Sequence, residues 1–182
     1  LPINRDEVAK ARNKLQADQD DAIARMVALP LVQEFETYRL KLFTQKKNAE
    51  WKTKRMTEDE IFKASFNSEA WKKEISFNPN SGNQLQVLLF ELLKLPVLDL
   101  TDTKQPATGK DTLKKLKHHT TNEDVLAFLD ALIDYTDVTI ILSIFIPAFE
   151  GAIQGPDGWH YLFGNFNLGG TKSGRLSSND PN

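Results

Sequence analysis

Helix-start signals recur along this chain and constrain its fold more than any other feature. Four times, a small polar residue is followed three positions later by Glu or Gln, close to apolar residues at helical spacing: Asn4 with Glu7, Thr57 with Glu60, Ser81 with Gln84, and Thr120 with Glu123. In such a capping box, the first side chain accepts a hydrogen bond from a free amide of the first turn, and the second reaches back to the first residue. The pattern predicts a mainly α-helical fold.

Apolar spacing predicts two long helices. The first covers residues 4–29, ends before Pro30, and carries one narrow apolar stripe, which suits packing against a single partner helix. The second opens at Thr120, and its apolar positions thicken between Val138 and Phe149 into a nearly continuous hydrophobic stretch. A helix that is apolar on all sides has to be covered, so we expect this end to be buried.

Two shorter helices are predicted between the long ones. One carries a leucine stripe and ends before Pro96; its apolar positions are Leu85, Leu88, Leu89 and Leu92. The other is a basic helix that we expect Thr108 to cap, and it ends at His118 and His119. Adjacent residues on a helix point about 100° apart, so these histidines form a poor metal-chelating pair. The turn at 155–158 and the aromatic segment that follows predict the first β structure.

Composition excludes several classes of protein. The chain has 182 residues, a net charge of −2 and no cysteine, which excludes a disulfide framework and thiolate metal sites and favours a cytoplasmic location. Its start has no signal-peptide pattern, and its longest apolar run is shorter than the roughly 20 residues of a membrane-spanning helix. The acidic run Glu58-Asp59-Glu60 stands at a predicted helix start, where compensation of the helix dipole explains it better than a metal site does.

Residues 38–73 form a locally basic segment with interleaved aromatic residues. They include ten basic and five acidic side chains. We expect residues 31–74 to form a small helical lobe with a few buried rings and a basic surface. Four of its lysines are candidates for contact with a polyanion: Lys46, Lys47, Lys52 and Lys54.

Two further segments carry groups suited to nucleic acid. Arg175 lies in the string TKSGRLSSNDPN, among short hydroxyl side chains and next to Gly174, so its guanidinium stands on backbone that a polyanion can approach closely. The helix start near Ser81 is surrounded by polar side chains, which are Asn78, Asn80, Asn83 and Gln84. Its free amides suit a phosphate, but ordinary capping explains the same residues and is the favoured interpretation.

Five stretches together resemble family A DNA polymerases of the phage type. Residues 171–182 resemble the T-x-[TS]-G-R-L-S-S-x-D-P-N segment that opens the palm, and residues 77–98 resemble the thumb segment F-N-x-x-S-x-x-Q-L-x-x-x-L-F-x-x-L-x-L-P. TDTKQPATG resembles the thumb's T-x-x-G-x-P-S-T, with Gln105 taken to stand where glycine is usual. Residues 1–15 are similar to the segment where the thumb begins, and Phe166-Asn167 is similar to the palm strand that leads to the arginine motif.

The resemblance implies a polymerase thumb followed by the start of the palm. The thumb would comprise residues 1–152, with a long antiparallel helix pair, and residues 31–74 would be an inserted lobe without a counterpart in the bacterial enzymes. Residues 153–182 would begin the palm with a short β segment. In the thioredoxin-borrowing phage polymerases the thumb also takes an insertion at this place, so the lobe could raise processivity through a bound factor or through its own basic surface. A surface loop with a solvated basic face and no role in processivity is an equally favoured interpretation.

The resemblance also assigns roles to residues. Arg175 would reach the minor groove at the primer end, with Thr171, Lys172, Ser173 and Asn182 beside it. The polar residues 78–84 named above, together with Lys104 and Thr108, would contact the backbone of the primer–template duplex. The carboxylates that hold Mg²⁺ for nucleotidyl transfer with deoxynucleotides lie beyond the family's D-P-N, so no catalytic residue and no metal site is expected here, and this stretch alone should be inactive. We expect the intact protein to continue beyond Asn182.

The chain departs from the family pattern in the second long helix, and an alternative function is open. The family usually carries lysines late in the long thumb helix, in a pattern like L-x-K-L-x-S-T-Y, where this chain has VTIILSIF, so that backbone contact is expected to be lost. The alternative function is a free-standing helical DNA-binding or processivity module without catalysis.

Overall fold

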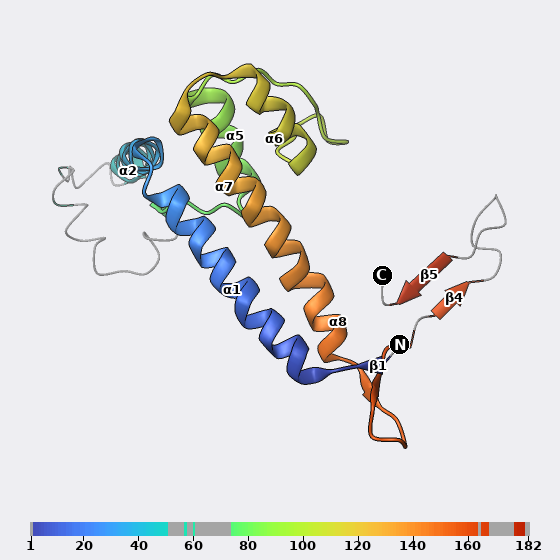
Figure 1. Cartoon of the computed structure of the whole chain (residues 1–182). Helices are drawn as coiled ribbons and strands as arrows, with labels where there is room; N and C mark the ends of the chain where they lie inside the picture. Colours follow the sequence, from blue (N-terminus) through green and yellow to red (C-terminus); the bar gives the residue numbers. More distant parts are fainter. Residues whose placement is uncertain are drawn as a thin grey trace. The chain divides into compact units, whose positions relative to one another are not determined.

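The computed structural model describes residues 2–50, 57, 60, 74–163, 165–167 and 177–180, and these are mainly helical (Figure 1). The predicted fold class is therefore confirmed. The described residues fall into two compact units, Leu1–Asp21 with Tyr135–Asn182, and Ala22–Asp134. No described helix combines the length and the apolar character that crossing a membrane requires.

The first unit is built on two antiparallel helical segments. One is the beginning of α1 (Arg5–Val27), and the other runs from the end of α7 (Glu123–Ile140) through the π-helical turn η3 (Ile141–Phe145) into α8 (Ile146–Glu150). Two side-chain hydrogen bonds between the segments show that they run in opposite directions: Arg12 Nη1 donates to Glu150 Oε1 at 2.7 Å, and the later Gln19 Nε2 donates to the earlier Thr139 Oγ1 at 2.8 Å. Figure 1 shows the two segments side by side. The predicted antiparallel helix pair is present.

A small sheet adjoins these helices. β1 (Pro2–Ile3) and β2 (Ile153–Gln154) both pair antiparallel with β3 (His160–Tyr161), in the order β1-β3-β2. The predicted turn joins β2 to β3, and Gly158 has a φ of +82° there, which a residue without Cβ adopts readily. β1 could not be predicted, because a strand of two residues has no period that could be recognised.

The apolar end of the long helix is exposed, so the prediction that it is buried is wrong. Ile144 is 51% exposed and Phe145 41%, whereas Ile146 is 3% exposed. The neighbouring segment of α1 is one helix with few apolar side chains, and a single helix covers one face only. The π-helical turn stands just before Pro147, which has no N–H for the carbonyl four residues earlier.

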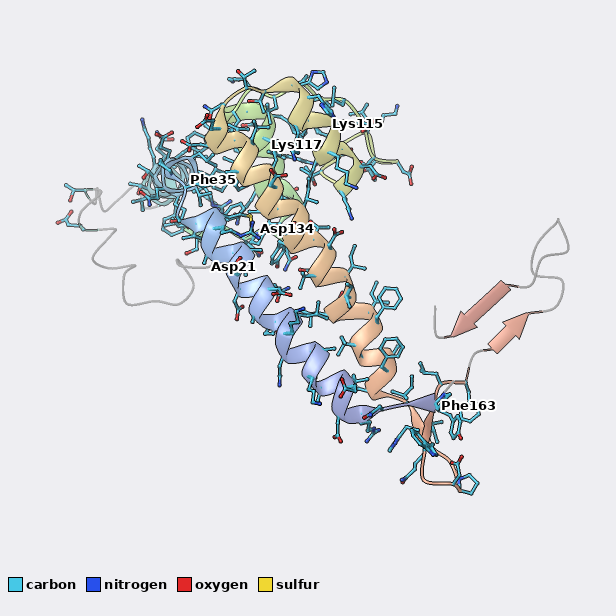
Figure 2. All side chains as sticks on the ribbon, in the orientation of Figure 1. Asp21, Phe35, Lys115, Lys117, Asp134 and Phe163 are labelled. Carbon is cyan, nitrogen blue, oxygen red and sulfur yellow. The ribbon has the colours of Figure 1, made fainter. Side chains whose placement is uncertain are left out.

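The second unit holds the larger core. It contains the end of α1, the first part of α7, and between them α2 (Pro30–Glu50), α5 (Gly82–Gln86), the π-helical η1 (Val87–Leu92), α6 (Lys110–Leu116) and the 3₁₀ turn η2 (Lys117–His119). At its centre, the ring of Phe77 lies edge-on to Phe35 at 6.1 Å and to Phe128 at 5.7 Å. Phe35, which falls within the expected lobe at 31–74, is fully buried in this core (labelled in Figure 2).

Helix starts were predicted with mixed success. Thr57 and Glu60 form a complete box, because Glu60 N donates to Thr57 Oγ1 at 3.3 Å and Thr57 N donates to Glu60 Oε2 at 2.8 Å. Asn4 Oδ1 accepts from the amides of Asp6 and Glu7 at 3.0 and 3.4 Å, but the Glu7 carboxylate pairs with Lys10.

Two predicted caps are wrong. Asn122, not Thr120, caps α7, because its Oδ1 accepts from Asp124 N at 2.9 Å. Gly109, not Thr108, is the N-cap of α6. In both cases a second residue that suits the N-cap position lies within two positions of the predicted one.

Candidate nucleic-acid interface

The polar residues around Ser81 are mostly engaged with one another. Ser81 Oγ accepts from Gln84 N at 3.4 Å, Gln84 Oε1 accepts from Asn78 N at 2.9 Å, and Asn78 Oδ1 accepts from Asn80 N at 2.9 Å. Gln84 is 6% exposed, whereas Asn80 and Asn83 are exposed. Local hydrogen bonds thus engage the side chains of Asn78, Ser81 and Gln84, whereas Asn80 and Asn83 are exposed and make no such side-chain bond.

A hydrogen-bonded loop from Asp99 to Gly109 lies against the same helix. Ala107 N donates to Asp99 O at 2.9 Å, and Leu100 and Pro106 form an isolated antiparallel bridge. Gln86 Nε2, at the end of α5, donates to Pro106 O at 2.8 Å. This bond joins residues 77–98 to the loop at 99–109, and neither the helical stripe nor the turn composition indicated it.

The tip of this loop has an unusual backbone. Lys104 has a φ of +60°, and its amide donates to Thr101 O at 2.8 Å. Counting along T-x-x-G-x-P from Thr101 places Lys104 at the glycine position, so the assignment of Gln105 to that position was wrong. The left-handed conformation explains why glycine suits this position.

Helix α6 is fixed to the loop by one carboxylate. Asp99 accepts hydrogen bonds from Lys115 Nζ at 2.9 Å and from Thr112 Oγ1 at 2.8 Å, and these two bonds hold the pKa of Asp99 below its usual value. Sequence reasoning missed this arrangement, because the partners lie 13 and 16 positions apart.

The lysines of this region differ in their availability. Lys115 pairs with Asp99, and Lys117 pairs with Asp130 (both lysines are labelled in Figure 2). Within the described ranges, the exposed side chains of Lys104 and Lys114 have no ion-pair partner. Residues 99–119 hold five lysines against three aspartates, a formal charge of +2. Thr108 is half-buried between the loop and α6.

The basic candidates on α2 are only partly described. Lys46 is exposed near the end of the helix, the side chain of Lys47 is not described, and Lys52 and Lys54 lie outside the described residues. Earlier in α2, the Arg39 guanidinium lies 5.7 Å from the centre of the Phe35 ring. Burial lowers the pKa of Arg39, and the carboxylates of Glu74 and Glu36 oppose that effect.

The arginine motif is bracketed by a strand pair. β4 (Asn165–Asn167) pairs antiparallel with β5 (Ser177–Asp180), with Phe166 opposite Ser178 and Asn167 opposite Ser177. The predicted strand at Phe166-Asn167 is therefore present. The residues that the sequence singled out in this motif lie outside the described residues: Thr171, Lys172, Ser173, Arg175 and Asn182.

Metal-ligating clusters are absent from the described ranges, where no three His, Asp or Glu side chains come together. Glu58 and Asp59 lie outside those ranges. His118 and His119 are exposed in η2 at the end of α6, in keeping with a solvated helix end.

The chain is similar to known polymerases. Residues 43–182 match the profile of DNA polymerase family A; the match begins inside the segment for which the sequence predicted no bacterial counterpart. DNA polymerase I of Bacillus subtilis (strain 168) is 38% identical over 108 residues, which are 58% of this chain and 11% of that protein. The thermostable DNA polymerase I of Thermus thermophilus is 29% identical over 129 residues, 70% of this chain and 14% of that protein. The DNA polymerase of Bacillus phage SP01 is 31% identical over 105 residues, 58% of this chain and 10% of that protein.

Among solved structures, the POL domain of Pol1 from M. smegmatis, in complex with DNA primer-template and dNTP, aligns with 87% of this chain and 26% of that one, at 22% identity and a TM-score of 0.46. The chain spans 10% to 14% of the length of the three sequence relatives. The profile match covers most of the chain, and the chain therefore belongs to DNA polymerase family A.

Proposed function

We propose that this chain is the thumb and the beginning of the palm of a DNA-directed DNA polymerase, and that it holds the primer–template duplex during replication, in a phage-type enzyme. The thumb comprises residues 1–152, with residues 31–74 as its inserted lobe, and the palm begins at 153. The observation that carries this proposal is the family match over residues 43–182, which includes the loop and the helix start described above.

The proposed duplex contact is to the DNA backbone, without reading of sequence. Asn80 and Asn83 offer exposed amides, and Lys104 and Lys114 offer exposed cations with no ion-pair partner among the described residues. The bond from Gln86 to Pro106 keeps the loop and the helix start together. Contacts of this kind position a protein on a duplex and carry no direct sequence information.

Arg175 is proposed to enter the minor groove at the primer end. The minor groove shows nearly the same acceptors for every correct base pair, so an arginine there senses pairing geometry and is indifferent to sequence. Thr171, Lys172, Ser173 and Asn182 would stand beside it. The supporting observations are the G-R-L-S-S string itself and the strand pair that brackets it.

Nucleotidyl transfer is proposed to belong to the intact protein. There, carboxylates of a following palm segment would hold two Mg²⁺ ions and act on deoxynucleotides. The 182 residues alone are proposed to bind DNA without polymerising.

The lobe at 31–74 is proposed to lengthen the product made in each binding event, through its basic surface or a bound factor. Reversing the charge of Lys46, Lys47, Lys52 and Lys54 in the intact polymerase should shorten that product. The same product length in the variant would rule out this part of the proposal.

The arginine role is tested by Arg175→Ala in the intact polymerase. Single-turnover insertion should slow far more than the affinity for primer–template falls, because positioning of the primer end matters in the transition state. Arg175→Lys keeps the charge without the planar fork and should slow insertion less. Equal losses of insertion rate and affinity in Arg175→Ala would contradict the role.

A further inference from the structure

Arg5 is the first residue of α1, a position that does not suit a cation. The free amides at the start of a helix carry partial positive charge, so this end of a helix favours acidic side chains. Asp6 and Glu7, which follow Arg5, meet that preference. Helix α1 therefore gives no reason for an arginine at its start, and the reason has to lie in what the guanidinium contacts.

The guanidinium of Arg5 lies at the end of a different helix. Its Nη2 donates to Glu150 O at 3.1 Å and to Ala152 O at 3.3 Å. Glu150 is the last residue of α8, and the last turn of α8 holds no basic residue of its own. Carbonyls at a helix end have no partner within the helix and carry partial negative charge. Arg5 thus supplies the cation that α8 lacks.

The two bonds of Arg5 span both places at which the chain passes between the helix pair and the small sheet. Arg5 lies two positions after β1, and Ala152 directly precedes β2. Both of these strands pair with β3, and Figure 1 shows the start of α1 and the end of α8 beside β1. One side chain therefore holds together a junction that comprises residues 2–5 and 150–154.

Few other contacts hold this junction. Among the described residues of the first unit, the buried hydrophobic residues are Ile3, Tyr135, Ile146 and Ala152. Arg12 also binds Glu150, but through the carboxylate, and the two side chains are 51% and 38% exposed. Exposed ion pairs of this kind contribute little to stability. Arg5 instead binds two backbone carbonyls, one of them on the buried Ala152, so it fixes the main chain itself.

We propose that Arg5 is a positioning residue of the polymerase, which fixes the thumb to the first strands of the palm and thereby slows the release of bound duplex. The inference rests on the proposed function, and it adds a residue to which no contact with DNA is assigned. A thumb held at its base keeps its duplex-binding surface in place, whereas a loosened thumb opens more often and lets the duplex dissociate. Insertion on a primer that is already bound does not depend on Arg5.

Variants of Arg5 in the intact polymerase test the proposal. Arg5→Gln should raise the dissociation rate of a fluorescein-labelled primer–template, measured after an excess of unlabelled duplex is added, by about fivefold, the lower end of the usual coupling between separate sites. The single-turnover insertion rate on prebound primer should not change. Arg5→Lys keeps the charge without the planar fork, so it should restore part of the loss.

Arg12→Gln is the matched control. It removes a cation from the same helix and from the same partner, Glu150, but leaves the bonds from Arg5 to the main chain. Its dissociation rate should equal that of the wild type.

Hydrogen–deuterium exchange of the same variants shows whether the junction is loosened. In Arg5→Gln, the amides of residues 151–154 and 160–161 should exchange faster, because the strands lose the bonds that hold the helix end beside them. Amides near Phe77, in the core of the second unit, should exchange as in the wild type. This comparison separates a local change at the junction from a general loss of stability.

The outcomes distinguish this inference from the proposed function. Faster dissociation and faster exchange at the junction in Arg5→Gln, with normal insertion and a normal Arg12→Gln, would support the inference. An unchanged dissociation rate, unchanged exchange at the junction, an equal loss in insertion, or the same effect in Arg12→Gln would overturn it and leave the proposed function standing. If the wild-type polymerase does not bind primer–template, the proposed function itself fails.

Discussion

Replacing Phe35 by alanine tests whether the beginning of α2 belongs to the core of the second unit. Its side chain is fully buried, and its ring packs edge-on against Phe77 at 6.1 Å. Truncating a buried Phe to Ala destabilises a protein by about 3–5 kcal/mol, of which the ring pair accounts for about 0.5–1.5 kcal/mol. Phe35→Leu keeps apolar bulk and loses the ring pair, so it should lose about 1–1.5 kcal/mol.

Urea unfolding followed by far-ultraviolet circular dichroism measures these losses. With a slope of about 2 kcal/mol per molar urea, the midpoint for Phe35→Ala should fall by roughly 2 M. Leu42→Ala is the control on the same helix, because Leu42 is 46% exposed, and it should change stability by less than about 1 kcal/mol. A loss below about 1 kcal/mol in Phe35→Ala would refute the reasoning and assign this part of α2 to a separate lobe.

Two further predictions follow from the fold. Asp99→Asn should lower the urea midpoint at neutral pH, because the bonds from Lys115 and Thr112 lower the pKa of Asp99 from its ordinary 3.8. Their contribution to stability is present above the ordinary pKa and is lost as the pH falls through the lower pKa of the folded state, so the urea midpoints of wild type and variant should converge in acid. A difference between these midpoints that does not depend on pH would exclude the carboxylate as the cause. Ile144 is 51% exposed, so Ile144→Lys should change stability by about 0.5 kcal/mol or less. Ile146 is 3% exposed, so Ile146→Lys should cost about 3 kcal/mol or more by burying an unpaired charge. Similar urea midpoints for the two variants would show that the apolar end of the long helix is covered in solution.

Local signals in the sequence predicted much of the helical framework. The Ser81 and Thr57 caps form from neighbouring residues, so their chemistry could be recognised without the fold. The caps at Thr120 and Thr108 were wrong by one or two residues, because Asn122 and Gly109 suit the same position and local pattern does not choose between them.

Features that depend on distant partners could not be predicted. Whether Ile144 and Phe145 are buried depends on how many elements cover them, and composition indicates only that they are apolar. The link from Gln86 to Pro106 spans 20 positions. The φ of Lys104 is a different case: lysine itself gives no signal of a left-handed backbone, and the glycine of T-x-x-G-x-P, which does, was assigned to Gln105.

The central claim is that the helix start at 78–84 and the loop at 99–109 together form a surface that binds the DNA backbone. Hydrogen–deuterium exchange of the wild-type chain, with and without a 20-base-pair duplex at low salt, tests it directly. The account predicts that amides of both segments become protected together and that the protection disappears as salt is raised. Exchange that is the same with and without DNA in both segments, under conditions where the duplex is bound, would contradict it.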